Sequence, residues 1–277
     1  MENDAAFNQA CDLAARCGAQ LTIVDVMADV PRAARQVMPP KLEQELVEHR
    51  LEALGALAKS RSDVRITTAV LRGRPAISLI QEVLRSDHDL LIRAHGRDLT
   101  ARTFGPIDTQ LLRQCPCPVW LLGPAERSEP RHILATVDLA SDVPDAEALN
   151  HHIIDLALTL GEAEHARISV LYVWTLFGQR VLPSHMPEDE YRDALESARR
   201  AATDALDRLL ETFGTRASDV RRACLNGEPE DVIPEFAMTE RADLVVMGSV
   251  ARTGVAGWLM GNTAEAVLRA LKGSVIA

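Results

Sequence analysis

An internal repeat constrains the fold of this 277-residue chain more than any other feature. Gly73-Arg-Pro75 is followed by Asp89-Leu-Leu-Ile92, and Gly227-Glu-Pro229 is followed at the same spacing by Asp243-Leu-Val-Val246. One shift in numbering therefore superimposes both blocks. Solenoid repeats are only about 20–50 residues long. Gly73 and its counterpart Gly227 lie much farther apart than about 50 residues. The repeat therefore indicates one domain copied in tandem.

The two copies are separated by residues 123–130, which are rich in proline, glycine and charge. Such breaker residues are typical of a linker. A globular domain usually holds about 100–200 residues. We therefore expect two domains, residues 1–123 and 131–277.

The second copy alternates apolar runs of strand length with helical apolar stripes, and we expect Gly161 to end its first helix. The strand runs are nearly continuous instead of alternating, which is typical of a parallel sheet covered on both faces. With right-handed crossovers, this order predicts a doubly wound α/β sheet. The expected strands are 133–137, 168–172, 220–225, 244–247 and 274–277, and the expected helices are 145–160, 191–213, 230–241 and 263–271.

The first copy has the same order of elements with one loss. It begins inside a helix at residues 7–17 and continues directly into a strand at residues 21–26. We therefore expect the first strand of domain 1 to be missing. The second copy stops at Ala277, within its expected last strand, so both ends of the sequence look clipped.

The composition argues against several classes of partner. Forty acidic residues against 30 basic ones give a formal charge of −10, whereas nucleic acids and anionic membranes attract basic surfaces. No apolar run approaches the ~18 residues of a membrane span, and the first residues do not resemble a signal peptide.

Five dispersed cysteines suit reduced thiols of the cytoplasm. Cys115-Pro-Cys117 lacks further metal ligands nearby, and we interpret its side chains as small apolar groups entering a buried strand.

Ligands of doubly wound sheets bind outside the carboxyl ends of the strands. In the second copy, the loop after residues 133–137 and the loop after residues 244–247 both reach that edge. Glycines that expose backbone amides, followed by a helix start, can hold an anion. In the structural alternative, Gly248 only turns the chain and Asn262 only caps a helix. The candidate binding residues are Asp138, Gly248, Ser249, Gly261, Asn262 and Thr263.

This pattern resembles the universal stress protein (UspA) family. Nucleotide-binding members carry Gly-x-x-Gly, nine residues and then Gly-Ser/Thr, and this chain has Gly248-Ser-Val-Ala251, nine residues and Gly261-Asn262-Thr263. Val-Asp138 is similar to the end of the family's first strand. The resemblance covers nearly the whole chain twice, and the tandem layout is similar to the UspE-type branch of the family.

The resemblance implies two five-stranded parallel sheets of the adenine nucleotide alpha hydrolase type, with strand order 3-2-1-4-5. It implies ATP as the ligand to consider for the second copy, and no other cofactor. It also implies an intramolecular pseudo-dimer of the two domains, in which residues 118–122 and 274–277 meet.

Departures from the family pattern weaken the expected site. Ala251 replaces the second glycine of the motif, and Asn262 replaces the hydroxyl residue. In the first copy, Ala94 stands where Gly248 does, and Pro106 stands where Asn262 does, which removes an amide donor. We do not expect ATP in the first copy, although Arg93, Arg97 and Arg102 remain candidate anion ligands unless they are simply solvated.

No sequence pattern indicates a catalytic or metal-binding constellation. One hypothesis is therefore a non-enzymatic, cytoplasmic stress-response protein whose second domain binds a small molecule or a protein partner. The alternative is an ATP-binding, slowly hydrolysing switch that uses the loop from Gly248 to Thr263. An adenylyl-transferring enzyme ranks last, because the loop after the first strand lacks a Ser-Gly-Gly signature.

Overall fold

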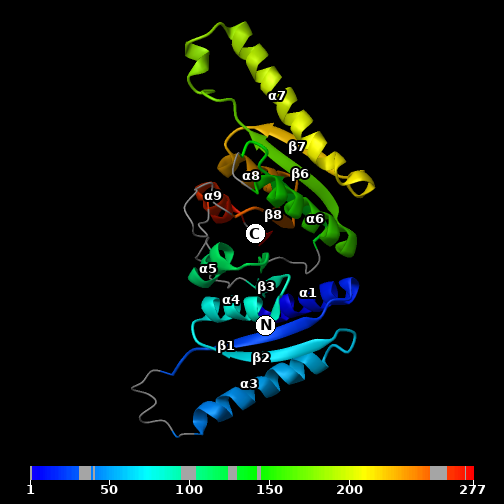
Figure 1. The fold of residues 1–277 in the computed structure, drawn as a ribbon, viewed down its shortest axis with the longest axis vertical. Helices are drawn as coiled ribbons and strands as arrows, with labels where there is room; N and C mark the ends of the chain where they lie inside the picture. The colour runs from blue at the N-terminus through cyan, green and yellow to red at the C-terminus, as the bar shows by residue number, and fades with distance from the viewer. Residues whose placement is uncertain are drawn as a thin grey trace. The chain divides into compact units, whose positions relative to one another are not determined.

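The structure is a computed structural model, and it describes residues 2–30, 39, 41–94, 104–123, 130–141, 145–249, 261–271 and 273–277. The described chain divides into two compact units (Figure 1). Unit 1 ends at Leu122, and unit 2 begins at Gly123. They correspond to the two copies of the sequence repeat.

Unit 2 contains a parallel sheet whose strands follow the order β9-β8-β5-β6-β7. Counted within the unit, this is the predicted order 3-2-1-4-5 of a doubly wound sheet, which is confirmed. The strands are β5 (His132–Val137), β6 (Arg167–Trp174), β7 (Arg221–Asn226), β8 (Leu244–Met247) and β9 (Ser274–Ile276). The helices are α6 (Ala146–Glu164), η1 (Leu182–Ser184), α7 (Glu188–Glu211), η2 (Gly214–Ala217), α8 (Pro229–Thr239) and α9 (Asn262–Ala270).

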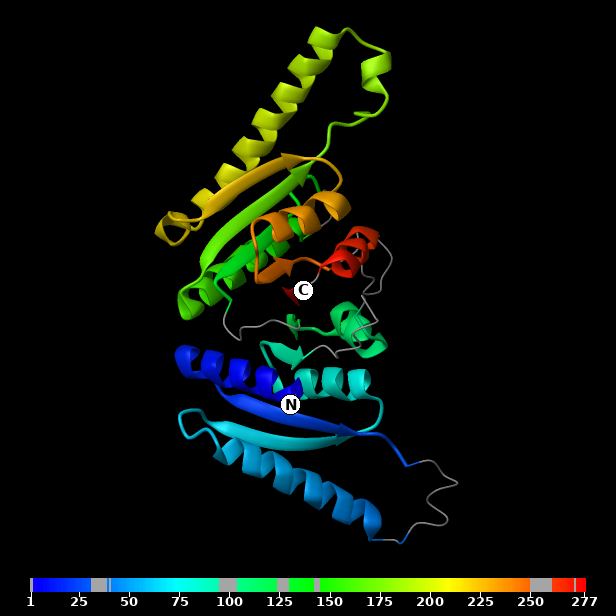
Figure 2. The ribbon, with the colours of Figure 1, turned by 180° about the vertical axis from the view of Figure 1, so that it is seen from behind.

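Helices cover both faces of this sheet, α6 and α7 on one side and α8 and α9 on the other (Figures 1 and 2). Every residue of β5 and β8 is buried, as the continuous apolar runs predict. Ile154 and Leu158 of α6, Leu171 of β6 and Leu206 of α7 are among the fully buried side chains. Since each such side chain contributes about 1.5–3 kcal/mol when it leaves water, this core fixes the edge from which the candidate loops extend.

The predicted end of α6 at Gly161 is wrong, because the helix continues to Glu164. A Cβ atom at Gly161 would lie 2.5 Å from Cδ1 of Ile168 on β6. The glycine therefore allows α6 to approach the sheet. The helix ends instead at His165, which has the left-handed conformation (φ 53°) common after a helix.

Unit 1 has the same order of elements but no five-stranded sheet among its described residues. β1 pairs with β2 and β3 pairs with β4, both in parallel, and the two pairs are not joined. The counterpart of β5, which joins β6 to β8 in unit 2, is the missing strand that the sequence predicts. The elements are α1 (Glu2–Cys17), β1 (Leu21–Met27), α3 (Leu42–Lys59), β2 (Ile66–Arg72), α4 (Pro75–Ser86), β3 (Leu91–Ala94), α5 (Pro106–Gln114) and β4 (Val119–Leu122).

The strands of unit 1 are less protected than those of unit 2. In β1 only Met27 is buried, and the preceding six residues are half-buried. No residue of α3, which packs on β1 and β2, is buried. Among the described residues no strand joins the two pairs, and the core of unit 1 is accordingly thinner than that of unit 2.

Candidate functional site

The two candidate loops of unit 2 begin at neighbouring strands. Thr136 of β5 lies opposite Met247 of β8, and the strands are parallel. Asp138 follows β5 and Gly248 follows β8 directly. The structure therefore brings Asp138, Gly248 and the adjacent Ser249 to the same carboxyl edge of the sheet, the usual place for a ligand in this fold.

Asp138 is held in place by Asn150, a buried residue of α6. The Asp138 amide donates to Oδ1 of Asn150 over 3.0 Å, and Nδ2 of Asn150 donates to the Asp138 carbonyl over 2.8 Å. Oδ1 of Asp138 accepts the amide of Ala140 at 3.2 Å. The loop thus has a fixed start, with a carboxylate at the sheet edge.

Sequence reasoning missed Asn150. The signal was present, because this amide lies three and four residues before Ile153 and Ile154 on the buried stripe of the helix. A polar side chain on such a stripe usually satisfies buried backbone groups.

Gly248 lies close against α6. A Cβ atom there would lie 3.0 Å from Cδ2 of Leu149 and 3.5 Å from Cδ1 of Ile153. A larger residue would require the Leu149 side chain to shift. This glycine therefore has a structural role, whatever ligand the loop holds.

Gly261, Asn262 and Thr263 form the start of α9. Gly261 is the N-cap residue, with φ −65° and ψ 146°, so the expectation that Asn262 caps the helix is wrong. Among the described residues, no side chain caps α9. The Gly261 amide donates to the Ser249 carbonyl over 3.1 Å and ties the two ends of the loop together. The side chains of Asn262 and Thr263 are exposed.

Several predicted features lie outside the described residues. These are Ala251, with the rest of loop residues 250–260, and Arg97 and Arg102 in unit 1. The remaining candidate of unit 1, Arg93, is described, and its side chain binds a carboxylate of the chain itself.

Arg93 of β3 pairs with Asp108 of α5. Its Nε atom donates to Oδ1 of Asp108 over 2.6 Å, and Oδ2 accepts the amide of Gly105 at 3.3 Å. Asp108 is only 2% exposed. A carboxylate of the chain itself therefore lies at the helix start where an external anion would bind.

The repeat places different residues at these positions in unit 2. Asp108 corresponds to Ala264 at the offset of 156 that relates Gly105 to Gly261, and Arg93 corresponds to Met247 at the offset of 154 that relates the preceding strands. Both replacements are buried and apolar. The start of α9 thus has no internal carboxylate at the position that Asp108 occupies in unit 1.

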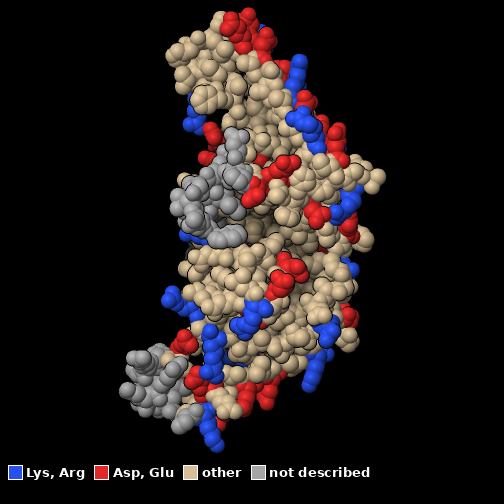
Figure 3. Space-filling model, viewed as in Figure 1, with Lys and Arg blue, Asp and Glu red and all other residues tan. Residues whose placement is uncertain are grey.

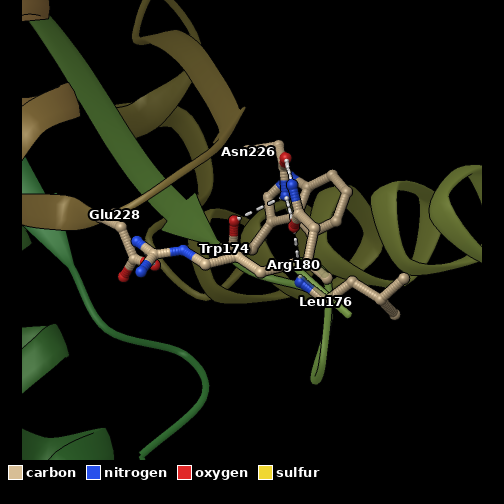
Figure 4. A network of polar contacts seen from close by, with 6 residues as sticks. Trp174, Leu176, Arg180, Asn226 and Glu228 are labelled. Carbon is tan, nitrogen blue, oxygen red and sulfur yellow. Dashed lines mark hydrogen bonds and ion pairs between the residues drawn. The ribbon is translucent and has the colours of Figure 1, made fainter. Parts of the chain in front are cut away.

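A network of side-chain amides orders the chain after β6 at the same sheet edge (Figure 4). Gln179 and Asn226 exchange two hydrogen bonds, of 2.6 and 2.9 Å. Nδ2 of Asn226 also donates to the Trp174 carbonyl, and Oε1 of Gln179 accepts the Leu176 amide. These bonds fix the segment beyond β6, the strand next to β5.

The described residues contain no group of three or more His, Cys, Asp or Glu side chains arranged to hold a metal ion. Within the same residues, no helix is long and apolar enough to cross a membrane. On the face in Figure 3, basic side chains are scattered among acidic ones, and acidic atoms gather at the start of α7, where Glu188, Asp189 and Glu190 lie.

Comparison with known proteins identifies relatives over the whole repeat. The Universal stress protein family model matches residues 2–123 and again residues 130–277. Universal stress protein E of Escherichia coli is 34% identical over 209 residues, which cover 73% of this chain and 64% of that protein. The matched region is thus under two thirds of this relative's length. A universal stress protein E homolog of Haemophilus influenzae is 25% identical over 262 residues, covering 91% of this chain and 83% of the relative.

Solved structures share the fold. A functionally unknown protein from Pseudomonas aeruginosa has a TM-score of 0.67 and 25% identity, covering 97% of this chain and 85% of that one. A universal stress protein from Archaeoglobus fulgidus has a TM-score of 0.65 and 14% identity, and the match covers 100% of this chain and 92% of that one. Together with the two tandem family matches, the doubled α/β fold confirms the prediction from sequence, and the chain belongs to the universal stress protein family.

Proposed function

We propose that this chain is a cytoplasmic stress-response protein that binds one nucleotide-type anionic ligand in unit 2 and catalyses no reaction on it. The ligand lies at the carboxyl edge of β5 and β8, between Asp138 and the start of α9. The Asp138 carboxylate accepts hydrogen bonds from a hydroxyl or amino group of the ligand. The first-turn amides and the side chains of Asn262 and Thr263 face its phosphate.

The contrast between Asp108 and Ala264 carries this proposal. The first amides of a helix lack helical acceptors and attract negative charge. In unit 1 the Asp108 carboxylate already satisfies that attraction. In unit 2 Ala264 carries no charge at that position, and the acidic residue of the first turn, Glu265, is paired with Arg269. The Gly261 amide already donates to the Ser249 carbonyl. The donors to the ligand are therefore the backbone amides of the residues that follow Gly261.

Absence of catalysis is proposed because the candidate residues offer one carboxylate and backbone donors, without a nucleophile paired to a base. Slow ATP hydrolysis by a switch protein is the alternative, and the same experiment separates the two.

Calorimetric titration of the full chain with Mg²⁺ and ATP tests the proposal. We expect one site per chain, with release of phosphate no faster than in buffer. In Ala264→Asp the new carboxylate repels the phosphate, and we expect affinity to fall by about ten-fold or more. Ala264→Asn has nearly the same shape without the charge and serves as the matched control, in which binding persists.

Other outcomes contradict parts of the proposal. No heat at millimolar nucleotide would exclude a site for ATP, and two sites per chain would contradict the assignment to unit 2 alone. Phosphate release that Ala264→Asp abolishes and Ala264→Asn retains would establish the hydrolysing switch instead.

A further inference from the structure

Two cysteines lie against each other in unit 1, at a place unrelated to the candidate ligand edge. Sγ of Cys115 and Sγ of Cys117 are 3.7 Å apart. Cys115 ends α5, and Cys117 precedes β4 by two residues. The pair therefore lies at the amino end of β4, whereas ligands of this fold bind at the carboxyl ends.

The local sequence holds the two thiols on one side of the chain. Cys115 is extended (φ −71°, ψ 131°), as expected before Pro116. Pro118 restricts Cys117 in the same way. The chain bends at Pro116 and Cys117, and this bend brings the two sulfurs together. Both side chains are half-buried, so small solutes reach them while the surrounding chain keeps them in contact.

The contact makes one thiol a better nucleophile. The Cys117 thiol donates a hydrogen bond that favours the Cys115 thiolate and lowers the pKa of Cys115 to about 7. The same interaction raises the pKa of Cys117. Burial raises the pKa of Cys11 and of Cys224. Since the thiolate is the reactive form, Cys115 is the strongest nucleophile of these four thiols at neutral pH.

The repeat does not need this pair for folding. In unit 2 the corresponding positions are Leu271 and Gly273, and the connection from α9 to β9 forms with neither sulfur. A pair of adjacent thiols that the fold does not require is a candidate for chemistry. Our sequence interpretation of both cysteines as apolar packing groups did not foresee the contact.

We propose that Cys115 and Cys117 form a redox-active dithiol that peroxides oxidise to an intramolecular disulfide. The Cys115 thiolate attacks one oxygen of hydrogen peroxide, the O–O bond breaks, and after proton uptake the products are a Cys115 sulfenic acid and water. The Cys117 sulfur then attacks the sulfenic sulfur, an S–S bond forms, and a second water leaves with the Cys117 proton. Two thiols are oxidised, and one peroxide is reduced.

The disulfide is easily reversed. A disulfide between Cys115 and Cys117 closes a small ring that contains Pro116. Strain in such a ring makes a disulfide more oxidising. A thiol of the glutathione class therefore restores the dithiol, which suits a sensor more than a permanent crosslink.

Oxidation of the full chain with hydrogen peroxide, followed by peptide mass mapping, tests the proposal. We expect the peptide with Cys115 and Cys117 to lose two hydrogens before Cys11, Cys17 or Cys224 reacts, and glutathione to restore it. In Cys117→Ser we expect a Cys115 sulfenic acid that dimedone captures. We also expect the pH midpoint of Cys115 alkylation, near 7 in the unaltered chain, to rise in Cys117→Ala, which has no side-chain donor at this position.

Cys117→Ala repeats the test without a hydroxyl, and a chain with Cys11, Cys17 and Cys224 all changed to alanine isolates the pair. The proposal is overturned if the isolated pair retains both thiols under peroxide or oxidises to sulfinic acid without a disulfide. An alkylation midpoint that is the same with and without Cys117 would also overturn it. None of these outcomes depends on nucleotide binding in unit 2.

Discussion

His132 and Ser169 share a buried hydrogen bond of 2.9 Å between the imidazole Nε2 atom and the serine hydroxyl. His132 is the first residue of β5, and both side chains are 2% exposed. Nδ1 of His132 lies 3.0 Å from the Glu240 carbonyl oxygen. Nη2 of Arg167 lies 3.1 Å from the same Nδ1 atom, so a carbonyl, which only accepts, and a guanidinium, which only donates, both face this ring nitrogen. Burial and the adjacent guanidinium both favour the neutral imidazole in the folded chain.

This arrangement predicts a loss of stability in mild acid. Burial, reinforced by the nearby Arg167 guanidinium, lowers the pKa of His132. The unfolded chain takes up a proton near pH 6.5, whereas the folded chain does so only at lower pH. Stability is therefore full above about pH 6.5 and falls below it, by at most about 1.4 kcal/mol per pH unit, until the folded-state pKa is reached.

Urea unfolding between pH 8 and pH 5 measures this effect. We expect His132→Gln to lower stability at pH 8, and to make it less dependent on pH across this range. His185→Gln, which changes an exposed histidine, serves as the control substitution. An equal pH dependence in His132→Gln and the unaltered chain would argue against the neutral, buried imidazole.

Two helical glycines should respond oppositely to alanine. In α3, a Cβ atom on Gly55 meets nothing within 4 Å, so Gly55→Ala should stabilise unit 1 by about 0.5–1 kcal/mol through helix propensity. In α6, a Cβ atom on Gly161 would lie 2.5 Å from Cδ1 of Ile168. There, overpacking of about 1–3 kcal/mol should exceed the propensity gain and destabilise unit 2.

Thermal unfolding of the two alanine variants compares the glycines directly. Ile168→Ala in the Gly161→Ala background removes the colliding atoms, so the two substitutions together should cost less than the sum of their separate effects. Strict additivity, or stabilisation by Gly161→Ala alone, would show that α6 does not need the glycine to approach β6.

The stability of unit 1 should fall more when the cation of the Arg93–Asp108 ion pair is removed than when the anion is neutralised. Arg93→Met removes the partner of a buried carboxylate, which is costlier than neutralising that carboxylate. Asp108→Asn keeps a similar shape and can still accept the Gly105 amide. We expect both variants to lower the free energy of unfolding of unit 1, with the larger loss in Arg93→Met. Urea unfolding checks the order, and the reverse order would contradict the role given to Arg93.

Sequence reasoning predicted the parts of the molecule that local patterns determine. The repeat and the continuous apolar runs predicted the doubly wound sheet of unit 2 and the missing strand of unit 1, whereas the strand order followed from the resemblance to the UspA family. Asp138 and Gly248 were found because each directly follows a predicted strand. The pairing of the two copies through residues 118–122 and 274–277 stays a prediction.

The rest depends on contacts between residues that are distant in sequence. Gly161 was interpreted as a helix end. The actual reason for a glycine there is the close approach of Ile168 on the next strand, which the local sequence does not reveal. Asp108 and Arg93 are 15 residues apart, and nothing local indicates that the helix start and the strand end meet. The thiol contact of Cys115 and Cys117 arises from the bend between them, which the spacing alone did not reveal.

Asn150 offers the sharpest test of how α6 supports the candidate site. Asn150→Ala leaves the amide and carbonyl of Asp138 without the two bonds that this side chain makes, and each such loss inside a protein costs about 1–3 kcal/mol. Asn150→Asp keeps the acceptor for the Asp138 amide but turns an oxygen toward the Asp138 carbonyl, so it should also destabilise unit 2 and displace the Asp138 loop. Urea unfolding measures the stability of both variants, and calorimetric titration with ATP measures their affinity. Because the proposed ligand contacts the Asp138 side chain and not Asn150, weaker binding by the folded variants identifies Asn150 as a positioning residue, whereas unchanged affinity with reduced stability would restrict it to the fold.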